Sequence, residues 1–291
     1  MKDDEKLIRL IRELSVPLAP EPVDLEGMWK DLASRPPALG GYRALLFDLY
    51  GTLFISAAGD MAVTPEEGTA REAPAPEEGI AEARAFFRQR VEQYHAEERA
   101  RGNPWPEVVV EEIWADYRGP VPGAWGSRES MDSRELALRY ELTLNPVYPM
   151  PRCRELIQTL ARRGMVLGII SNAQFFSPLL FTAFFGAPPE DLGFDAGLLL
   201  YSFEKRKAKP SPDLFAQARS ILAQRGIGGE ETLYVGNDMG KDMVPAAAAG
   251  FKTALFAGDR RSLRLRETDP ACAACKPDLV LRDLQALMTD R

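Results

Sequence analysis

Cysteine is scarce in this chain of 291 residues, which contains only Cys153, Cys272 and Cys275. Three thiols are too few for a disulfide framework or for a four-thiolate zinc site, so we expect neither to hold the fold together. Cys272 and Cys275 form a CxxC pair, which could be a redox pair or half of a metal site. The surrounding segment, DPACAACKPD, is typical of a loop and has no histidine, so we expect reduced surface thiols there.

Long apolar runs and the basic stripe of a nucleic-acid binder are also missing. No stretch approaches the roughly 18 uninterrupted apolar residues that would span a membrane, and the first residues, MKDDEKLIRLIREL, lack the basic start and apolar middle of a signal peptide. The formal net charge is −7, and Lys and Arg are spread along the chain. The sequence therefore predicts a soluble cytoplasmic protein with neither nucleic acid nor membrane as a partner. Its hydrophobic content of 45% is enough for a substantial core.

Strand-like and helix-like segments alternate through most of the chain. The segments YRALLFDLY (42–50) and MVLGIISNA (165–173) are short and continuously apolar, as strands buried on both faces are. Between and after them come the segments CRELIQTLARRG, FDAGLLLYS, PDLFAQARSILAQRG, ETLYVGND, VPAAAAGF, KTALFAG and PDLVLRDLQALM. This alternation predicts an α/β fold with a doubly wound, Rossmann-like parallel sheet.

The chain divides into three parts by composition. Residues 1–40 are expected to form an N-terminal helical extension, with a helix over 1–19 before a Pro-rich stretch. Residues 41–56 and 148–291 carry the α/β pattern, and residues 57–147 are an insertion. Within the insertion we expect a mobile acidic loop at 57–79 and helices near 80–102, 107–118 and 132–144. The single histidine, His95, lies among charged residues of the first of these helices, so we expect it to be exposed and not catalytic.

Polar residues follow four of the expected strands, where an open parallel sheet binds its ligands. They are Asp48, Ser171 with Asn172, Lys209 within KRKAKPSPDLF, and Asn237, Asp238 and Asp242 after TLYVG. In their order and approximate spacing, these segments resemble the four motifs of the haloacid dehalogenase-like (HAD) hydrolase superfamily. The resemblance covers about 41–56 and 148–288, and the helices between resemble its cap domain of the first type.

The resemblance implies roles for these residues. Asp48 would be the covalent nucleophile, Lys209 a cation aimed at it, and Thr52, Ser171 and Asn172 donors to the substrate. A magnesium ion would be held by Asp48, by the main-chain carbonyl of Tyr50 and by Asp238, with Asp242 as a water-bound ligand or a partner of Lys209. Asn237 is the alternative to Asp238, because the family writes this motif in two registers.

Tyr50 departs from the phosphatase pattern. Phosphatases of this superfamily usually carry a second aspartate there as a general acid and base, and losing such help costs about 10²–10⁴-fold in rate. A phenol with a pKa near 10 is a poor substitute. The dehalogenase branch has a tyrosine in a similar DxYGT signature, because a halide leaving group needs no proton.

Other residues depart from the dehalogenase pattern. Its fourth motif resembles Ser-Ser-Asn followed by a single acid, whereas this chain has Asp238 and Asp242, and Phe215 stands where dehalogenases have a tyrosine. We therefore expect a magnesium-dependent phosphatase of a small phosphorylated metabolite. The alternatives are a metal-independent 2-haloacid dehalogenase, or a catalytically weak binding or assembly module. The apolar segment FFSPLLFTAFF is expected to form a helix under the cap or a homodimer contact.

Overall fold

A six-stranded parallel sheet lies at the centre of the computed structural model, which describes residues 2–33, 40–59 and 79–289. The strand order is β5-β4-β1-β6-β7-β8, and every neighbouring pair is parallel. The strands are β1 (Ala44–Phe47), β4 (Val166–Ser171), β5 (Phe194–Tyr201), β6 (Thr232–Gly236), β7 (Lys252–Phe256) and β8 (Leu279–Leu281). The predicted doubly wound α/β fold is confirmed, and the strand order reverses beside β1, which is where such sheets bind ligands.

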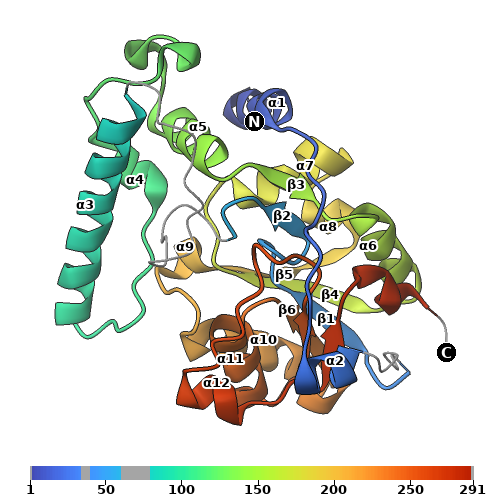
Figure 1. Ribbon diagram of the computed structural model, residues 1–291. Helices are drawn as coiled ribbons and strands as arrows, with labels where there is room; N and C mark the ends of the chain where they lie inside the picture. The colour runs from blue at the N-terminus through green and yellow to red at the C-terminus, as the bar shows by residue number, and fades with distance from the viewer. Residues whose placement is uncertain (1, 34–39, 60–78, 290–291) are drawn as a thin grey trace.

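Helices cover both faces of the sheet (Figure 1). Side chains of β1 alternate between two apolar clusters, with Leu45 and Phe47 in one and Leu46 in the other. The first cluster includes α6 (Cys153–Arg162) and α7 (Ser177–Phe185), and the second includes α10 (Pro212–Gln224). Burial of β1 on both sides explains why its sequence is continuously apolar up to Asp48.

Two short strands, β2 (Phe54–Ser56) and β3 (Val147–Pro149), form a separate antiparallel pair that the sequence did not predict. Ser56 pairs with Val147, so the two ends of the inserted segment lie side by side. The insertion contains α3 (Ile80–Ala100), α4 (Val110–Ala115) and α5 (Ser133–Leu144), which lie to one side of the sheet (Figure 1). The domain boundaries drawn from the sequence stay a prediction, and most of the loop expected at 57–79 is outside the described residues.

The N-terminal helix α1 (Lys2–Leu14) packs against α7 and α5 (Figure 1). Its Leu7, Leu10 and Ile11 are buried. The FFSPLLFTAFF segment thus forms a helix as expected, but α1 of the same chain covers it. A second helix, α2 (Gly27–Ala33), occurs in the Pro-rich stretch where no helix was predicted.

The remaining elements are single turns or short helices. They are α8 (Pro189–Leu192), α9 (Ser202–Lys205), α11 (Val244–Ala248), α12 (Pro270–Ala274), η1 (Gly123–Trp125), η2 (Arg128–Ser130), η3 (Gly229–Glu231), η4 (Met239–Met243) and η5 (Leu284–Met288). Two expectations were wrong: His95 is half-buried, and Cys272 is buried on α12, where a loop with surface thiols was expected. Within the described ranges, no helix combines the length and the apolar character needed to cross a membrane.

Candidate active site

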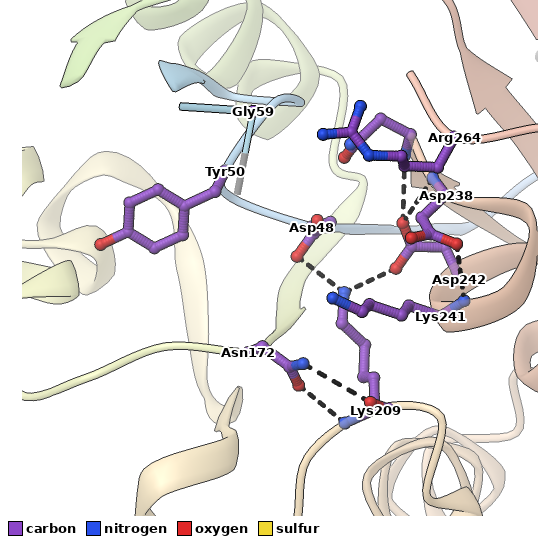
Figure 2. A pocket seen from close by; sticks show the side chains of 10 residues that line it. Asp48, Tyr50, Gly59, Asn172, Lys209, Asp238, Lys241, Asp242 and Arg264 are labelled. Carbon is purple, nitrogen blue, oxygen red and sulfur yellow. Dashed lines mark hydrogen bonds and ion pairs between the residues drawn. The ribbon is translucent and has the colours of Figure 1, made fainter. Parts of the chain in front are cut away.

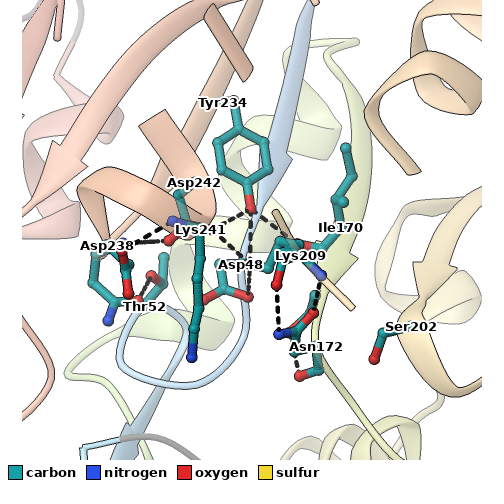
Figure 3. A network of polar contacts seen from close by, with 12 residues as sticks. Asp48, Thr52, Ile170, Asn172, Ser202, Lys209, Tyr234, Asp238, Lys241 and Asp242 are labelled. Atoms are coloured by element: carbon teal, nitrogen blue, oxygen red, sulfur yellow. Dashed lines mark hydrogen bonds and ion pairs between the residues drawn. The ribbon is translucent and has the colours of Figure 1, made fainter. Parts of the chain in front are cut away.

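Three charged side chains from separate segments form a buried ion-pair network at the end of β1 (Figure 3). Lys209 Nζ lies 2.7 Å from Asp48 Oδ1 and 2.5 Å from Asp242 Oδ1. The hydroxyl of Tyr234, on β6, lies 2.9 Å from the same Asp242 oxygen and 3.2 Å from Lys209 Nζ. The side chain of Lys209 is only 2% exposed. A buried charge needs partners of opposite sign, and here one ammonium is shared by two carboxylates.

Asn172 fixes the backbone of Lys209. The Lys209 N–H donates to Asn172 Oδ1 at 2.7 Å, and Asn172 Nδ2 lies 3.5 Å from the Lys209 carbonyl oxygen. Asn172 follows β4, so it joins the loop after that strand to the segment that carries the lysine. Its amide therefore aims a long, flexible side chain at Asp48, although sequence reasoning had assigned it to the substrate.

Burial and charge act against each other in this network. Burial opposes the charge on Lys209, but the carboxylates of Asp242 and Asp48 outweigh it and raise the pKa of Lys209 above its ordinary value. Burial raises the pKa of Asp242 to about 7, although Lys209 acts in the opposite direction. Lys209 is thus a permanent cation, whereas Asp242 can change its charge near neutral pH.

The Tyr50 side chain turns away from Asp48 (Figure 2). Its hydroxyl lies 2.9 Å from Ser177 Oγ on α7. Burial, with a further contribution from the Glu141 carboxylate, raises the pKa of Tyr50 well above its ordinary value. Tyr50 therefore cannot serve as a base at neutral pH, and its hydroxyl is not aimed at the leaving group of a substrate on Asp48.

Asp238 is held by Arg266, a residue that sequence reasoning missed. Arg266 Nε lies 2.6 Å from Asp238 Oδ1, and Arg266 Nη2 lies 2.6 Å from Asp238 Oδ2. The N–H groups of Gly240 and Lys241 also donate to Oδ1, at 2.8 and 2.9 Å. Although burial acts the other way, Arg266 lowers the pKa of Asp238 below its usual value. Arg266 belongs to the segment RRSLRLRE, which reads as an ordinary surface basic stretch.

Two hydroxyls that were expected to bind substrate instead contact protein groups. Thr52 Oγ1 donates to Asn237 Oδ1 at 3.0 Å, and Asn237 Nδ2 donates to the Ser262 carbonyl oxygen at 2.7 Å. Ser171 is completely buried, and its hydroxyl donates to the Asn172 carbonyl oxygen at 3.0 Å. In this arrangement Thr52 and Ser171 shape the loops around the site.

These strand-end segments surround one pocket (Figure 2). The lining residues are Asp48, Tyr50, Gly59, Asn172, Lys209, Asn237, Asp238, Lys241, Asp242 and Arg264. Three of them are carboxylates and three are cations, and Arg266 behind Asp238 adds a further positive charge. A polar pocket with a positive balance favours a small anion. The structure thus brings Asp48, Asn172, Lys209, Asp238 and Asp242 together, as the sequence predicted.

The carboxylates of Asp238 and Asp242 do not fit the expected magnesium site. Both oxygens of Asp238 are bonded to Arg266. Asp242 Oδ1 contacts Lys209 and Tyr234, while Asp242 Oδ2 accepts the N–H groups of Asn237 and Asp238 at 3.1 and 3.0 Å. Among the residues that the structure describes, no group of three or more acidic, histidine or cysteine side chains could hold a metal. Magnesium prefers hard oxygen ligands, and here these oxygens already have protein partners.

The chain is similar to one protein family and to several solved structures. A model of a hydrolase family, the haloacid dehalogenase-like hydrolases, matches residues 42–250. Similar solved structures include the L-2-haloacid dehalogenase from Xanthobacter autotrophicus, with 22% identity, a TM-score of 0.48, and coverage of 85% of this chain and 97% of that one. They also include the HAD phosphatase from Thermococcus onnurineus, with 16% identity, a TM-score of 0.47, and coverage of 84% and 95%. No curated protein sequence matches the chain.

Proposed function

Because the chain belongs to the haloacid dehalogenase-like hydrolase family, we propose that it hydrolyses a small anionic substrate through a covalent intermediate on Asp48. The observation that carries the proposal is the placement of Lys209 Nζ at 2.7 Å from Asp48 Oδ1, at the carboxyl end of the central strand. A carboxylate is a modest nucleophile, so it needs a fixed position and a neighbouring cation that lowers the charge repulsion of an anionic substrate.

Each polar side chain of the site has a separate role in the proposed reaction. Asp48 attacks the electrophilic atom, and the leaving group departs with the electrons of the broken bond. Water then cleaves the covalent intermediate, which is an acyl phosphate for a phosphate monoester and an ester for a haloacid, and the Asp48 carboxylate is restored. Lys209 holds the Asp48 carboxylate through the 2.7 Å ion pair and offsets the negative charge that builds up around it. Lys241 and Arg264 line the pocket, and they bring further positive charge to the anionic group of the substrate. Asn172 positions Lys209 through its backbone.

A phosphate monoester is the first candidate substrate. The lining is polar and brings the charges of Lys209, Lys241 and Arg264 into one pocket, which suits a doubly charged phosphoryl group. The magnesium ion that the sequence predicts does not fit, because Arg266 engages the Asp238 carboxylate. Side-chain cations would therefore have to supply the positive charge in phosphoryl transfer.

A 2-haloacid is the second candidate, and the position of Tyr50 favours it. The Tyr50 hydroxyl contacts Ser177, so the residue offers no proton to a departing alkoxide. A halide leaves without a proton, and its displacement by Asp48 would need neither a general acid nor a metal. The carboxylate of a haloacid would meet the same cations as a phosphate.

Product release distinguishes the two candidates. Purified protein is incubated with p-nitrophenyl phosphate, with a panel of phosphorylated metabolites and with 2-chloropropionate, and free phosphate and chloride are measured. We expect Asp48→Asn to lower the active reaction at least about a thousandfold. The control is Asp116→Asn, which changes an exposed aspartate paired with Arg90 and should leave the rate unchanged.

Three results would change the proposal. Activity that survives in Asp48→Asn would exclude the covalent step. Chloride release without phosphate release would select the dehalogenase. If the folded protein releases neither product, the third hypothesis, a binding or assembly module, would replace the catalytic one.

A further inference from the structure

The cation beside Asp238 is the guanidinium of Arg266, and its position determines whether this carboxylate can bind a metal ion. We infer that Arg266 occupies the place of a metal ion at Asp238, so that the site functions with charge supplied by the protein alone. The Arg266 guanidinium would neutralise the Asp238 carboxylate in either candidate reaction. The inference rests on the proposed function only in taking this pocket as the active site.

The contact has the geometry of a strong ion pair. Two Arg266 nitrogens face the two Asp238 oxygens, each at 2.6 Å, in the fork arrangement that matches a guanidinium to a carboxylate. The Asp238 side chain is 7% exposed and that of Arg266 is 26% exposed. Water therefore screens this pair less than it screens an ion pair at the surface.

The surrounding backbone holds Arg266 in this position. The Met239 N–H donates to the Arg264 carbonyl oxygen at 2.9 Å, and the Arg264 N–H donates to the Asn237 carbonyl oxygen at 3.0 Å. These two bonds align the loop that carries Arg266 with the motif that carries Asp238. Arg266 itself has φ +50°, in the left-handed region that few residues other than glycine adopt.

Gly240 leaves room for the arginine stem. A Cβ atom at position 240 would lie 2.8 Å from Arg266 Cδ, closer than two carbon atoms approach. A side chain at this position would push the guanidinium away from Asp238. The close approach of Gly240, the left-handed backbone at Arg266 and the paired loops all support the same contact.

A magnesium ion would have to break this arrangement. To reach Asp238 it would displace the guanidinium, and to reach Asp242 it would compete with Lys209 and with two backbone N–H groups. Magnesium also loses its own water reluctantly. The wild-type protein should therefore bind magnesium weakly, and removal of Arg266 should create a binding site.

Titration calorimetry with MgCl₂ and with MnCl₂ tests the inference without any need for turnover. Wild-type protein should show no saturable binding at millimolar metal. Arg266→Gln should show saturable binding, with a Kd at least about tenfold below the highest metal concentration tested, because a freed carboxylate is a hard oxygen ligand. Arg264→Gln is the matched control, since it removes an equal positive charge from the same loop but not the partner of Asp238. The double variant Arg266→Gln with Asp238→Asn should lose the gained affinity.

Two results would overturn the inference. One is tight magnesium binding by wild-type protein that disappears in Asp238→Asn, a measurement that remains informative even if Arg266→Gln fails to fold. The other is an equal gain in Arg264→Gln and Arg266→Gln, which would show a general charge effect. Because binding is measured directly, a protein without activity could still show that Arg266 occupies the place of the metal ion, and so failure of the inference is distinct from failure of the proposed function.

Discussion

At the scale of single residues, Asp242 couples the active site to pH. Burial raises the pKa of Asp242 to about 7, so the carboxyl group is protonated below that pH and ionised above it. When Asp242 is protonated, Lys209 loses one of its two negative partners and is drawn more strongly to Asp48, whose carboxylate is then less nucleophilic. We expect kcat/KM to rise as the pH increases through about 7.

The Asp242→Asn variant tests this coupling. It has no ionisable group at position 242, so its pH–rate profile should lack the rise near neutral pH, whereas Asp116→Asn should keep it. A profile of Asp242→Asn with the wild-type inflection would assign that ionisation to another group. Circular dichroism of each variant checks that the fold is retained across the pH range.

Tyr50 can be tested with two substitutions. Tyr50→Phe removes the hydroxyl that contacts Ser177, and it should leave the rate within about twofold of wild type because no proton passes through that group. Tyr50→Asp restores the acid that phosphatases carry, and release of phosphate should rise several-fold while release of chloride should not. If Tyr50→Phe is inactive, the hydroxyl has a role that its orientation does not indicate. If phosphate release by Tyr50→Asp does not rise, another group already supplies the proton.

At the scale of helices and strands, the sequence predicted the sheet because its strands are continuous apolar runs. Strands such as β1 and β4 are buried on both faces, so each is an uninterrupted apolar run that ends at a polar residue. The pair β2–β3 was missed because three residues are too few to show an alternating pattern. The helix α2, of seven residues, lies within a Pro-rich stretch, whose composition predicts a loop.

The candidate site was predictable to the extent that its residues follow strands. Asp48 and Asn172 lie just beyond β1 and β4, and parallel strands bring their carboxyl ends to one edge of the sheet. Arg266 could not be found in this way, because it reaches Asp238 from a loop whose path depends on the fold. The orientation of Tyr50 was equally hidden, since a sequence places a residue but not the direction of its side chain.

At the scale of the whole molecule, α1 covers the apolar α7, which the sequence predicted to lie under the cap or to form a homodimer contact. Ile11 is completely buried, and Arg12 Nε donates to the Ala183 carbonyl oxygen at 2.8 Å. The large apolar side chains that remain exposed in the described ranges are Leu14, Val16, Met28 and Trp105. None of these four residues lies on α7, so association through α7 would require α1 to move away.

Separating α1 from α7 should therefore cause association. Ile11→Asp places a charge in the contact between the two helices, which is unfavourable without a partner, and it should expose the apolar face of α7. Size-exclusion chromatography with light scattering, over a range of concentrations, should show a growing mass for Ile11→Asp. The control Arg9→Asp changes an exposed position of the same helix and should keep the mass of the wild-type protein. A wild-type chain that is already dimeric would mean that another surface forms the contact, because α1 leaves α7 covered.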